Sequence, residues 1–153
     1  MSDRRPSWDE YFLSITREVA RRSTCLRRQV GAVLVRGKRL LATGYNGAPT
    51  GIRHCREVGC LRQKAGVPSG QRHELCRGLH AEMNVIIQAA VYGIETAGST
   101  LYVTAYPCSL CAKMMINAGV KRVVVTEDYP DELAKEMFAE AGITVEIIDL
   151  ASG

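Results

Sequence analysis

Four side chains in two short segments constrain the fold of this chain more than any other feature of its sequence. One segment contains His80 and, two residues later, Glu82, while the other is a Pro-Cys-x-x-Cys sequence that contains Cys108 and Cys111. One imidazole and two thiolates are typical zinc ligands, and three protein ligands leave the fourth position of a tetrahedral ion open. The fold must therefore bring two distant segments together, and we expect a hydrolytic zinc site rather than a closed structural one.

The spacing of these residues places them at the starts of two helices. Cys108 and Cys111 are three residues apart, and the apolar pattern that follows predicts a helix over residues 108–118, so that both thiols face the same way. His80 opens a second such pattern over residues 79–92. The positive ends of both helix dipoles would then point at the metal, which favours thiolate over thiol.

Glu82 is expected to have a different role from the metal ligands. It lies two residues after His80, and on a regular helix two side chains at that spacing do not share a face. We therefore expect Glu82 to act as general acid and base, carrying protons between the attacking water and the substrate. The combined pattern is typical of zinc deaminases that act on nucleobases. For an isolated Cys-x-x-Cys, a structural zinc or a thiol redox pair is the alternative.

The length and composition of the chain indicate one globular domain. Its 153 residues suffice for one core but not comfortably for two, so we expect a single domain over residues 1–153. No apolar run approaches the roughly 20 residues that span a bilayer, and no apolar signal core follows the N-terminus, which predicts a cytoplasmic protein without membrane contact. The formal net charge of +4 fits an anionic small molecule and does not call for nucleic acid.

Hydrophobic periodicity predicts the remaining elements. A capping box that starts at Ser7 opens a helix to about residue 22, with Phe12, Ile15 and Val19 as its buried stripe. We expect a hairpin that turns at Arg36 and Gly37, and then alternating helices and strands. The strands are predicted over residues 30–35, 38–45, 100–104, 120–126 and 144–148, and a last helix over residues 130–141. This order predicts a three-layer α/β domain with a five-stranded mixed sheet and its site at the carboxyl ends of strands.

The turn-rich sequence after residue 45 allows two interpretations of Asn46. Its amide could contact a ligand sugar, or the residue could supply a left-handed turn, and the residue alone favours the turn. Residues 47–75 show little periodicity, and so long an irregular loop is unusual in a compact domain unless something ties it down. We treat residues 47–76, approximately, as a cysteine-bearing insertion.

The remaining cysteines are candidates for a second, structural zinc that ties down this insertion. Four thiolates suffice for a closed tetrahedral site, and the chain offers Cys25, Cys55, Cys60 and Cys76. Either His54 or His73 could replace one of them as a ligand. The alternative is that all four are buried free thiols, because no close Cys-x-x-Cys pair occurs among them.

The chain resembles the deoxycytidylate (dCMP) deaminases of the cytidine-deaminase-like superfamily over residues 7–148. The matching segments are Val-Gly-Ala-Val at 30–33, Gly-Tyr-Asn-Gly at 44–47, His-Ala-Glu-Met-Asn at 80–84, Pro-Cys-Ser-Leu-Cys-Ala-Lys at 107–113 and Asn-Ala-Gly-Val at 117–120. The resemblance implies an αβα cytidine-deaminase-like domain and hydrolysis of dCMP to dUMP and ammonia, which supplies dUMP for thymidylate synthesis. It also implies a homo-oligomer, hexameric or dimeric, and regulation by dCTP and dTTP, with Mg²⁺ accompanying a nucleotide effector.

The resemblance further implies roles for individual residues. By position, His80, Cys108 and Cys111 are similar to the zinc ligands, Glu82 to the proton carrier and Asn46 to the sugar-contacting amide. Four residues would surround the cytosine: Ala81 through its backbone N–H, Ala105 through its carbonyl, and Tyr106 and Tyr129, although either tyrosine could equally belong to the core. Two residues are candidates for binding the phosphate, since a guanidinium can donate two parallel hydrogen bonds to it: Arg27 and Arg28.

Several alternatives remain at this point. A tRNA adenosine deaminase shares the His-Ala-Glu and Pro-Cys-x-x-Cys segments, but an RNA substrate calls for a more basic surface. A deaminase of another cytosine nucleotide, such as dCTP, would use the same chemistry. A free-cytidine deaminase resembles the chain less, because that group usually has Cys at the position of His80. A zinc-stapled module that binds nucleic acid is disfavoured by Glu82, since a closed structural site needs no free carboxylate beside it.

Overall fold

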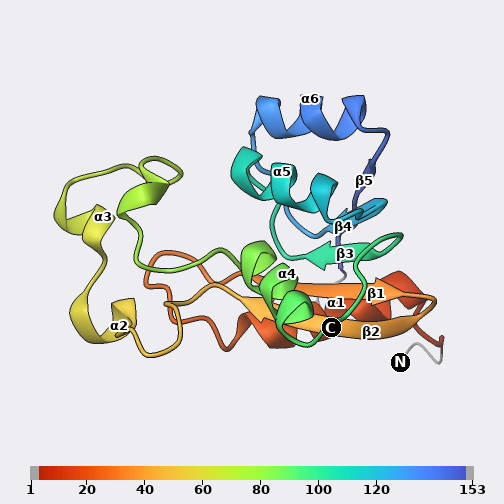
Figure 1. The fold of residues 1–153 in the computed structure, drawn as a ribbon, viewed down its shortest axis with the longest axis horizontal. Coiled ribbons are helices and arrows are strands. Elements are labelled where there is room, and N and C mark those ends of the chain that lie inside the picture. The colour runs from red at the N-terminus through yellow and green to blue at the C-terminus, as the bar shows by residue number, and fades with distance from the viewer. Residues whose placement is uncertain (1–3, 151–153) are drawn as a thin grey trace.

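A five-stranded mixed sheet separates two layers of helices in the computed structural model, which describes residues 4–150 (Figure 1). The strand order is β2-β1-β3-β4-β5; β1 runs antiparallel to both of its neighbours, and β3, β4 and β5 are parallel to one another. The predicted αβα fold with a mixed sheet is thereby confirmed. The strands are β1 (Gly31–Arg36), β2 (Arg39–Tyr45), β3 (Thr100–Val103), β4 (Arg122–Val125) and β5 (Thr144–Ile147).

The hairpin between β1 and β2 turns one residue later than the sequence suggested. Arg36 still belongs to β1 and pairs with Arg39, so the two turn residues are Gly37 and Lys38. Both have left-handed backbone conformations, with φ of 57° and 61°. Two left-handed residues are typical of the tight hairpin turn whose twist matches that of its strands.

Successive residues of the strands alternate between two apolar cores. On one face, Leu34, Leu101 and Val123 pack against three helices: α4 (Ala81–Val91), α5 (Ser109–Asn117) and α6 (Glu132–Glu140). On the other face, Val33 and Val124 pack against α1 (Trp8–Ala20). Within the described range 4–150, no helix is both long and apolar enough to span a bilayer.

The first helix begins with the expected capping box and ends two residues earlier than predicted. Ser7 Oγ accepts a hydrogen bond from the Glu10 N–H at 3.1 Å, and the Glu10 carboxylate accepts one from the Ser7 N–H at 3.0 Å. Ile15 and Val19 are only partly buried, because the helix is rotated slightly from the predicted orientation. Its fully buried residues are Phe12, Leu13, Thr16 and Ala20.

The first turn of α4 lies against β2 without space for a side chain at Gly44. A Cβ atom on Gly44 would lie 2.5 Å from the Ala81 carbonyl oxygen and 2.5 Å from the Val85 nitrogen. Beside this contact, the Asn84 side chain donates a hydrogen bond to the Tyr45 carbonyl at 2.8 Å. The close approach and the hydrogen bond fix the start of α4, and with it the residues of the catalytic segment, relative to the sheet.

Residues 47–76 project from the sheet as an irregular arm, which Figure 1 shows on the left. The arm contains two four-residue helices, α2 (Cys55–Val58) and α3 (Leu61–Lys64), and the 3₁₀ helix η1 (His73–Leu75). Gly47 and Leu79 exchange two backbone hydrogen bonds, of 3.2 and 2.8 Å, and so hold the two ends of the arm together.

Candidate metal centre and cleft

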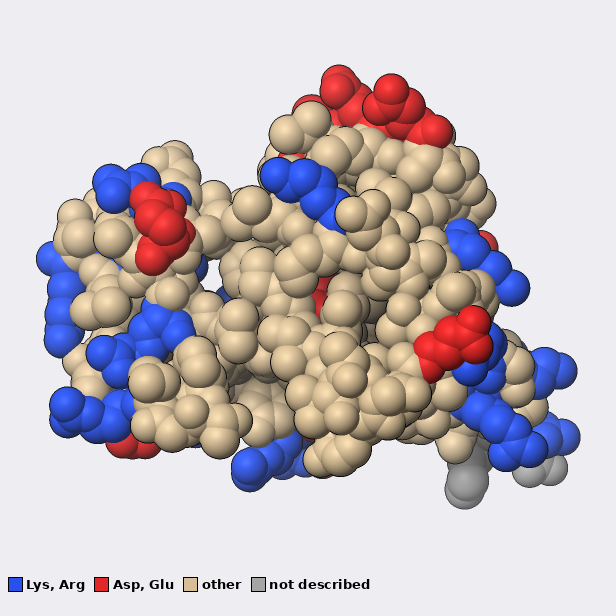
Figure 2. All heavy atoms as spheres, in the orientation of Figure 1, with Lys and Arg blue, Asp and Glu red and all other residues tan. Residues whose placement is uncertain are grey.

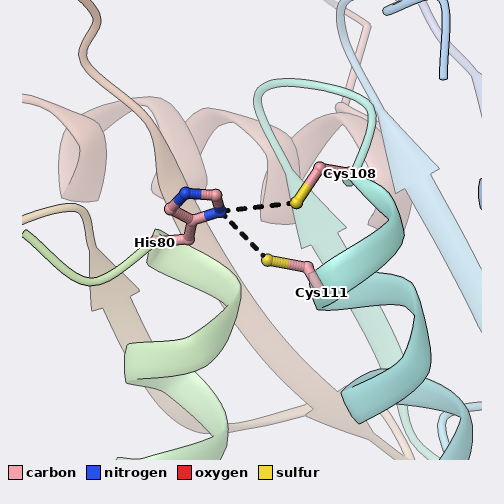
Figure 3. Close-up of side chains that lie close together, drawn as sticks. All are labelled: His80, Cys108 and Cys111. Atoms are coloured by element: carbon pink, nitrogen blue, oxygen red, sulfur yellow. Dashed lines mark hydrogen bonds between the residues drawn. The ribbon is translucent and has the colours of Figure 1, made fainter. Parts of the chain in front are cut away.

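The three expected metal ligands come together where α4 and α5 begin (Figure 3). His80 and Cys108 are the N-cap residues of α4 and α5, and Cys111 lies in the first turn of α5. The Nδ1 atom of His80 is 3.3 Å from the Cys111 sulfur and 3.5 Å from the Cys108 sulfur. A tetrahedral zinc ion would separate a nitrogen and a sulfur ligand by about 3.5 Å, given its usual bond lengths. The three side chains therefore fit zinc with little rearrangement.

The acid–base properties of the three ligands also suit a cation. The hydrogen bond from Cys111, assisted by His80, lowers the pKa of Cys108 to about 4, so that Cys108 is a thiolate at neutral pH. The same hydrogen bond and burial raise the pKa of Cys111, while the hydrogen bond with Cys108 raises the pKa of His80. Zinc would displace the remaining protons, as metal binding to thiols and imidazoles generally does.

Glu82 lies beside the metal ligands but is not one of them. Among residues 4–150, His80, Cys108 and Cys111 are the only group of such side chains with ligand atoms within 4.8 Å of one another. The Glu82 side chain is buried, with 5% of the residue exposed, and burial raises the pKa of its carboxyl group. A carboxyl group with a raised pKa can both accept and donate a proton near neutral pH.

A cleft of about 900 Å³, including its open mouth, gives access to the metal ligands and Glu82. His80 and Cys108 line it, whereas Cys111 is fully buried and does not. The same cleft is lined by every residue that the resemblance implied for substrate binding: Arg27, Arg28, Asn46, Ala81, Ala105, Tyr106 and Tyr129. The fold thus gathers around one opening residues from five separate parts of the sequence.

Asn46 does not supply a left-handed turn, so that interpretation is wrong. The described non-glycine residues with positive φ are Lys38 and Arg72. The Asn46 side chain instead accepts a hydrogen bond from the Val30 N–H at 2.9 Å and donates one to the Arg28 carbonyl at 2.7 Å. It ties the chain before β1 to the end of β2, and its second amide N–H has no hydrogen-bond partner among the described residues.

Tyr106 and Tyr129 both pack in the core and line the cleft, the two alternatives that their sequence positions allow. Tyr106 is buried in the core beneath the cleft, where its ring meets that of Phe138 edge to face at 6.2 Å. Tyr129 is half-buried and packs on the same core, with the Arg28 guanidinium 5.9 Å from its ring centre. Both tyrosines are therefore core residues that also line the cleft.

One cleft residue, Arg62, is not indicated by any sequence pattern. It lies on α3 in the arm, only 8% of the residue is exposed, and it lines the cleft together with Ser69 and His73. The Arg62 guanidinium donates a hydrogen bond to the Gln71 carbonyl at 2.9 Å. Residues 47–75 show no periodic pattern, so nothing in the sequence places Arg62 near His80.

The other four cysteines lie near one another without forming a compact ligand group. Cys25, Cys55 and Cys76 line the cleft. Burial raises the pKa of Cys55, and the nearby thiols of Cys76, Cys25 and Cys60 raise it further. Their sulfur atoms do not come within 4.8 Å of one another as a group in the described structure. The two alternate ligands contact other residues: the His54 ring is hydrogen-bonded to Thr24 at 2.9 Å, and the His73 ring lies 4.8 Å from the ring of His80.

The sequence matches the family model of the cytidine and deoxycytidylate deaminase zinc-binding region over residues 6–127. It is 44% identical over 147 residues to ComE operon protein 2 of Bacillus subtilis, covering 95% of this chain and 74% of that protein. It is 41% identical over 133 residues to the deoxycytidylate deaminase of Mycobacterium phage D29, covering 84% and 98%. The deoxycytidylate deaminase of Schizosaccharomyces pombe is 40% identical over 142 residues, but the match covers 91% of this chain and only 43% of that longer protein.

Solved structures agree with these relatives. The dCMP deaminase of cyanophage S-TIM5, in complex with dCMP and dUMP, has a TM-score of 0.79 and 29% identity, covering 95% of this chain and 99% of that one. A tRNA:A34 deaminase structure has a TM-score of 0.56 and 21% identity, covering 91% of each chain. The second likeness shows a shared fold alone.

Proposed function

The chain belongs to the cytidine and deoxycytidylate deaminase family, and on that premise we propose that it catalyses the zinc-dependent hydrolysis of dCMP to dUMP and ammonia. The observation that carries the proposal is the metal centre of His80, Cys108 and Cys111 with buried Glu82 in the same cleft. The choice of dCMP is supported by the phage relative, whose whole length nearly matches, and by the cyanophage structure with dCMP and dUMP. We take residues 1–153 to form one deaminase domain with an insertion at about 47–76.

The chemistry is divided between the cofactor and Glu82. When bound, zinc supplies the Lewis acidity that allows water to act as a nucleophile near neutral pH. Glu82 takes a proton from the attacking water and delivers it to N3 of the cytosine, and then carries a second proton to the departing amino group. Its burial at the base of the cleft keeps bulk water from competing for these protons.

The remaining cleft residues orient the nucleotide. The Ala81 N–H and the Ala105 carbonyl are suited to the donor and acceptor groups on the edge of cytosine. Tyr106 and Tyr129 form walls for the base, and the free N–H of the Asn46 amide is available to the sugar. Support for these assignments comes from their common place around one opening, next to the metal ligands.

We expect dCMP to lose its cytosine absorbance when it is incubated with zinc-loaded protein. As substrates, dCTP, CMP, deoxycytidine and an adenosine-bearing tRNA stem-loop should react more slowly than dCMP. Each reaction is measured alone and again with dCTP or dTTP added as an effector. Preferential turnover of dCTP would favour the alternative nucleotide substrate. Reaction of the stem-loop alone would favour a tRNA adenosine deaminase and contradict the proposal.

A second, structural zinc bound by the four remaining cysteines is part of the proposed function. Their mutual proximity around Cys55 supports it, and the contacts of His54 and His73 favour a four-cysteine site over one that uses a histidine. Metal analysis of the purified protein should find two zinc ions per chain, and Cys60→Ser should retain one and melt at a lower temperature. One zinc per chain in the wild type would exclude this second site.

We further propose a cytoplasmic homo-oligomer, a hexamer or a dimer, that responds to dCTP and dTTP, with Mg²⁺ accompanying the effector. The end of α4 supports assembly, because Val91 and Tyr92 are 72% and 73% exposed, and Figure 2 shows few charged side chains over α4. All six cysteines are free, as is usual in a reducing compartment. The proposed response to these effectors rests on the family resemblance. Light scattering with and without dCTP or dTTP tests the oligomeric state and its response to them.

A further inference from the structure

We propose that Arg62 and Arg27 together bind the 5′-phosphate of the substrate, so that the arm selects a nucleotide over a nucleoside. This inference rests on the proposed function, because it assigns a subsite of the same cleft. It makes Arg62 a specificity-determining residue that reaches the cleft from an irregular part of the sequence.

Arg62 is a buried cation with an unused donor. It lines the cleft with 8% of the residue exposed, and its Nη1 atom donates to the Gln71 carbonyl at 2.9 Å. Its Nε atom is buried and has no hydrogen-bond partner in the described structure. A buried donor without a hydrogen-bond partner is unfavourable, so the Arg62 Nε–H is available to an acceptor atom of a bound ligand.

Arg27 repeats this arrangement from another part of the sequence. It lies between α1 and β1, and its Nη2 atom donates to the Val67 carbonyl at 2.7 Å. Its Nη1 atom is buried without a partner among residues 4–150, and the residue lines the same cleft. The carbonyls of Val67 and Gln71, in one short turn of the arm, thus orient both guanidinium groups.

The charge of this pair is not balanced by a carboxylate. Neither Arg27 nor Arg62 forms an ion pair within the described structure, whereas Arg28 pairs with Glu127 at 2.9 Å. Arg28 is therefore the poorer of the two phosphate candidates from the sequence. Two uncompensated guanidinium groups in a cleft favour an anion, and phosphate accepts their parallel N–H groups.

The location of Arg62 suits the phosphate end of a nucleotide. The Arg62 Nη1 atom is 3.5 Å from Nδ1 of His73, and the His73 ring in turn lies 4.8 Å from that of the metal ligand His80. One imidazole therefore separates the guanidinium from the metal centre, and the sugar candidate Asn46 lines the same opening. The arm is itself basic, with five basic side chains against two acidic ones over residues 47–76, and Figure 2 shows Lys and Arg gathered over it.

The test compares binding of dUMP and deoxyuridine, which differ only in the phosphate. Arg62→Gln should weaken dUMP binding about 10- to 100-fold and leave deoxyuridine binding unchanged, because hydrogen bonds between charged groups are lost only with the nucleotide. Arg27→Gln should act in the same direction, and Arg62→Lys should recover part of the loss by keeping the charge. The matched control is Arg56→Gln, an exposed residue of α2 outside the cleft, which should bind both ligands as the wild type does.

Inorganic phosphate provides a second probe that needs no nucleoside. It should compete with dUMP in the wild type and in Arg56→Gln, and lose this effect in Arg62→Gln. Equal weakening of dUMP and deoxyuridine, together with a lower melting temperature, would show a structural role and overturn the inference. If Arg62→Gln does not fold, Arg62→Lys and Arg27→Gln decide, and an unchanged ratio of dUMP to deoxyuridine affinity in both overturns it.

Failure of the inference and failure of the proposed function give different results. The binding measurements do not depend on turnover, so a phosphate site can stand even if no cytosine substrate reacts. Conversely, if the wild type deaminates dCMP and Arg62→Gln keeps its KM for dCMP, the function stands and this assignment of the phosphate site falls.

Discussion

Replacement of Glu82 by Gln should lower the turnover of dCMP by at least about a hundredfold, which is the usual contribution of a positioned general acid and base. Gln has nearly the same shape as Glu but cannot take up a proton from water and pass it on. Because Glu82 is not a metal ligand, the zinc content of the variant should equal that of the wild type. Single-turnover measurement of dUMP formation, with zinc determined on the same sample, tests this expectation.

The stability of the Glu82→Gln variant provides an internal check. Glu82 is almost fully buried, and burial raises the pKa of its carboxyl group because a charged form is poorly solvated there. A neutral amide avoids that cost, so the melting temperature should not fall. Glu136→Gln, on the exposed side of α6, is the matched control and should keep full activity. Activity of Glu82→Gln within about threefold of the wild type would contradict the proton-carrier role.

Replacement of Cys108 by Ala should remove the catalytic zinc and lower turnover at least about a thousandfold, since Lewis acidity contributes several kcal/mol to such reactions. Cys108 has the lowest pKa of the ligand group, and its loss leaves one thiol and one imidazole to hold the ion. The zinc content of this variant and its turnover of dCMP should fall together, and added zinc should not restore activity.

Two comparisons identify the cause of this loss. Wild-type protein that has been stripped by a chelator should regain activity when zinc is returned, whereas the Cys108→Ala variant should not. Cys60→Ser is the comparison cysteine variant, because Cys60 does not line the cleft, and it should keep the catalytic ion although it loses the proposed structural one. Full zinc binding and turnover by Cys108→Ala would mean that the metal is held elsewhere.

The metal centre was predictable from sequence because each of its two halves is a local feature of a helix start. Cys108 and Cys111 occupy the N-cap and first turn of one helix, and His80 caps another, so spacing and helix-start signals together define the donor set. The sheet was predictable for a similar reason, since its five strands are separated by clear turn residues. The helix and strand ends shifted by one or two residues, as for Arg36 in the first hairpin.

What escaped prediction depends on contacts between distant residues. The hydrogen bonds between the Asn46 side chain and the segment before β1 are tertiary contacts, which cannot be predicted from the residue type alone. The position of Arg62 depends on the path of the arm, which is set by hydrogen bonds such as the backbone pair between Gly47 and Leu79 and the bond from Arg62 to the Gln71 carbonyl. Neither helix nor strand periodicity encodes such a path, so only the structure could place Arg62 in the cleft.

The position of the metal ligands on α4 and α5 has a consequence for the lifetime of the enzyme. His80 is fixed through α4 to the antiparallel strands β1 and β2, whereas the two cysteines follow β3 and belong to the parallel part of the sheet. A bound ion therefore cross-links the two parts of the sheet. It also closes a loop of chain between His80 and Cys108, and this loop contains the central strand β3. A chain that loses its zinc would open locally at these helices and become a better substrate for proteases, so the cell would remove inactive molecules in preference to active ones.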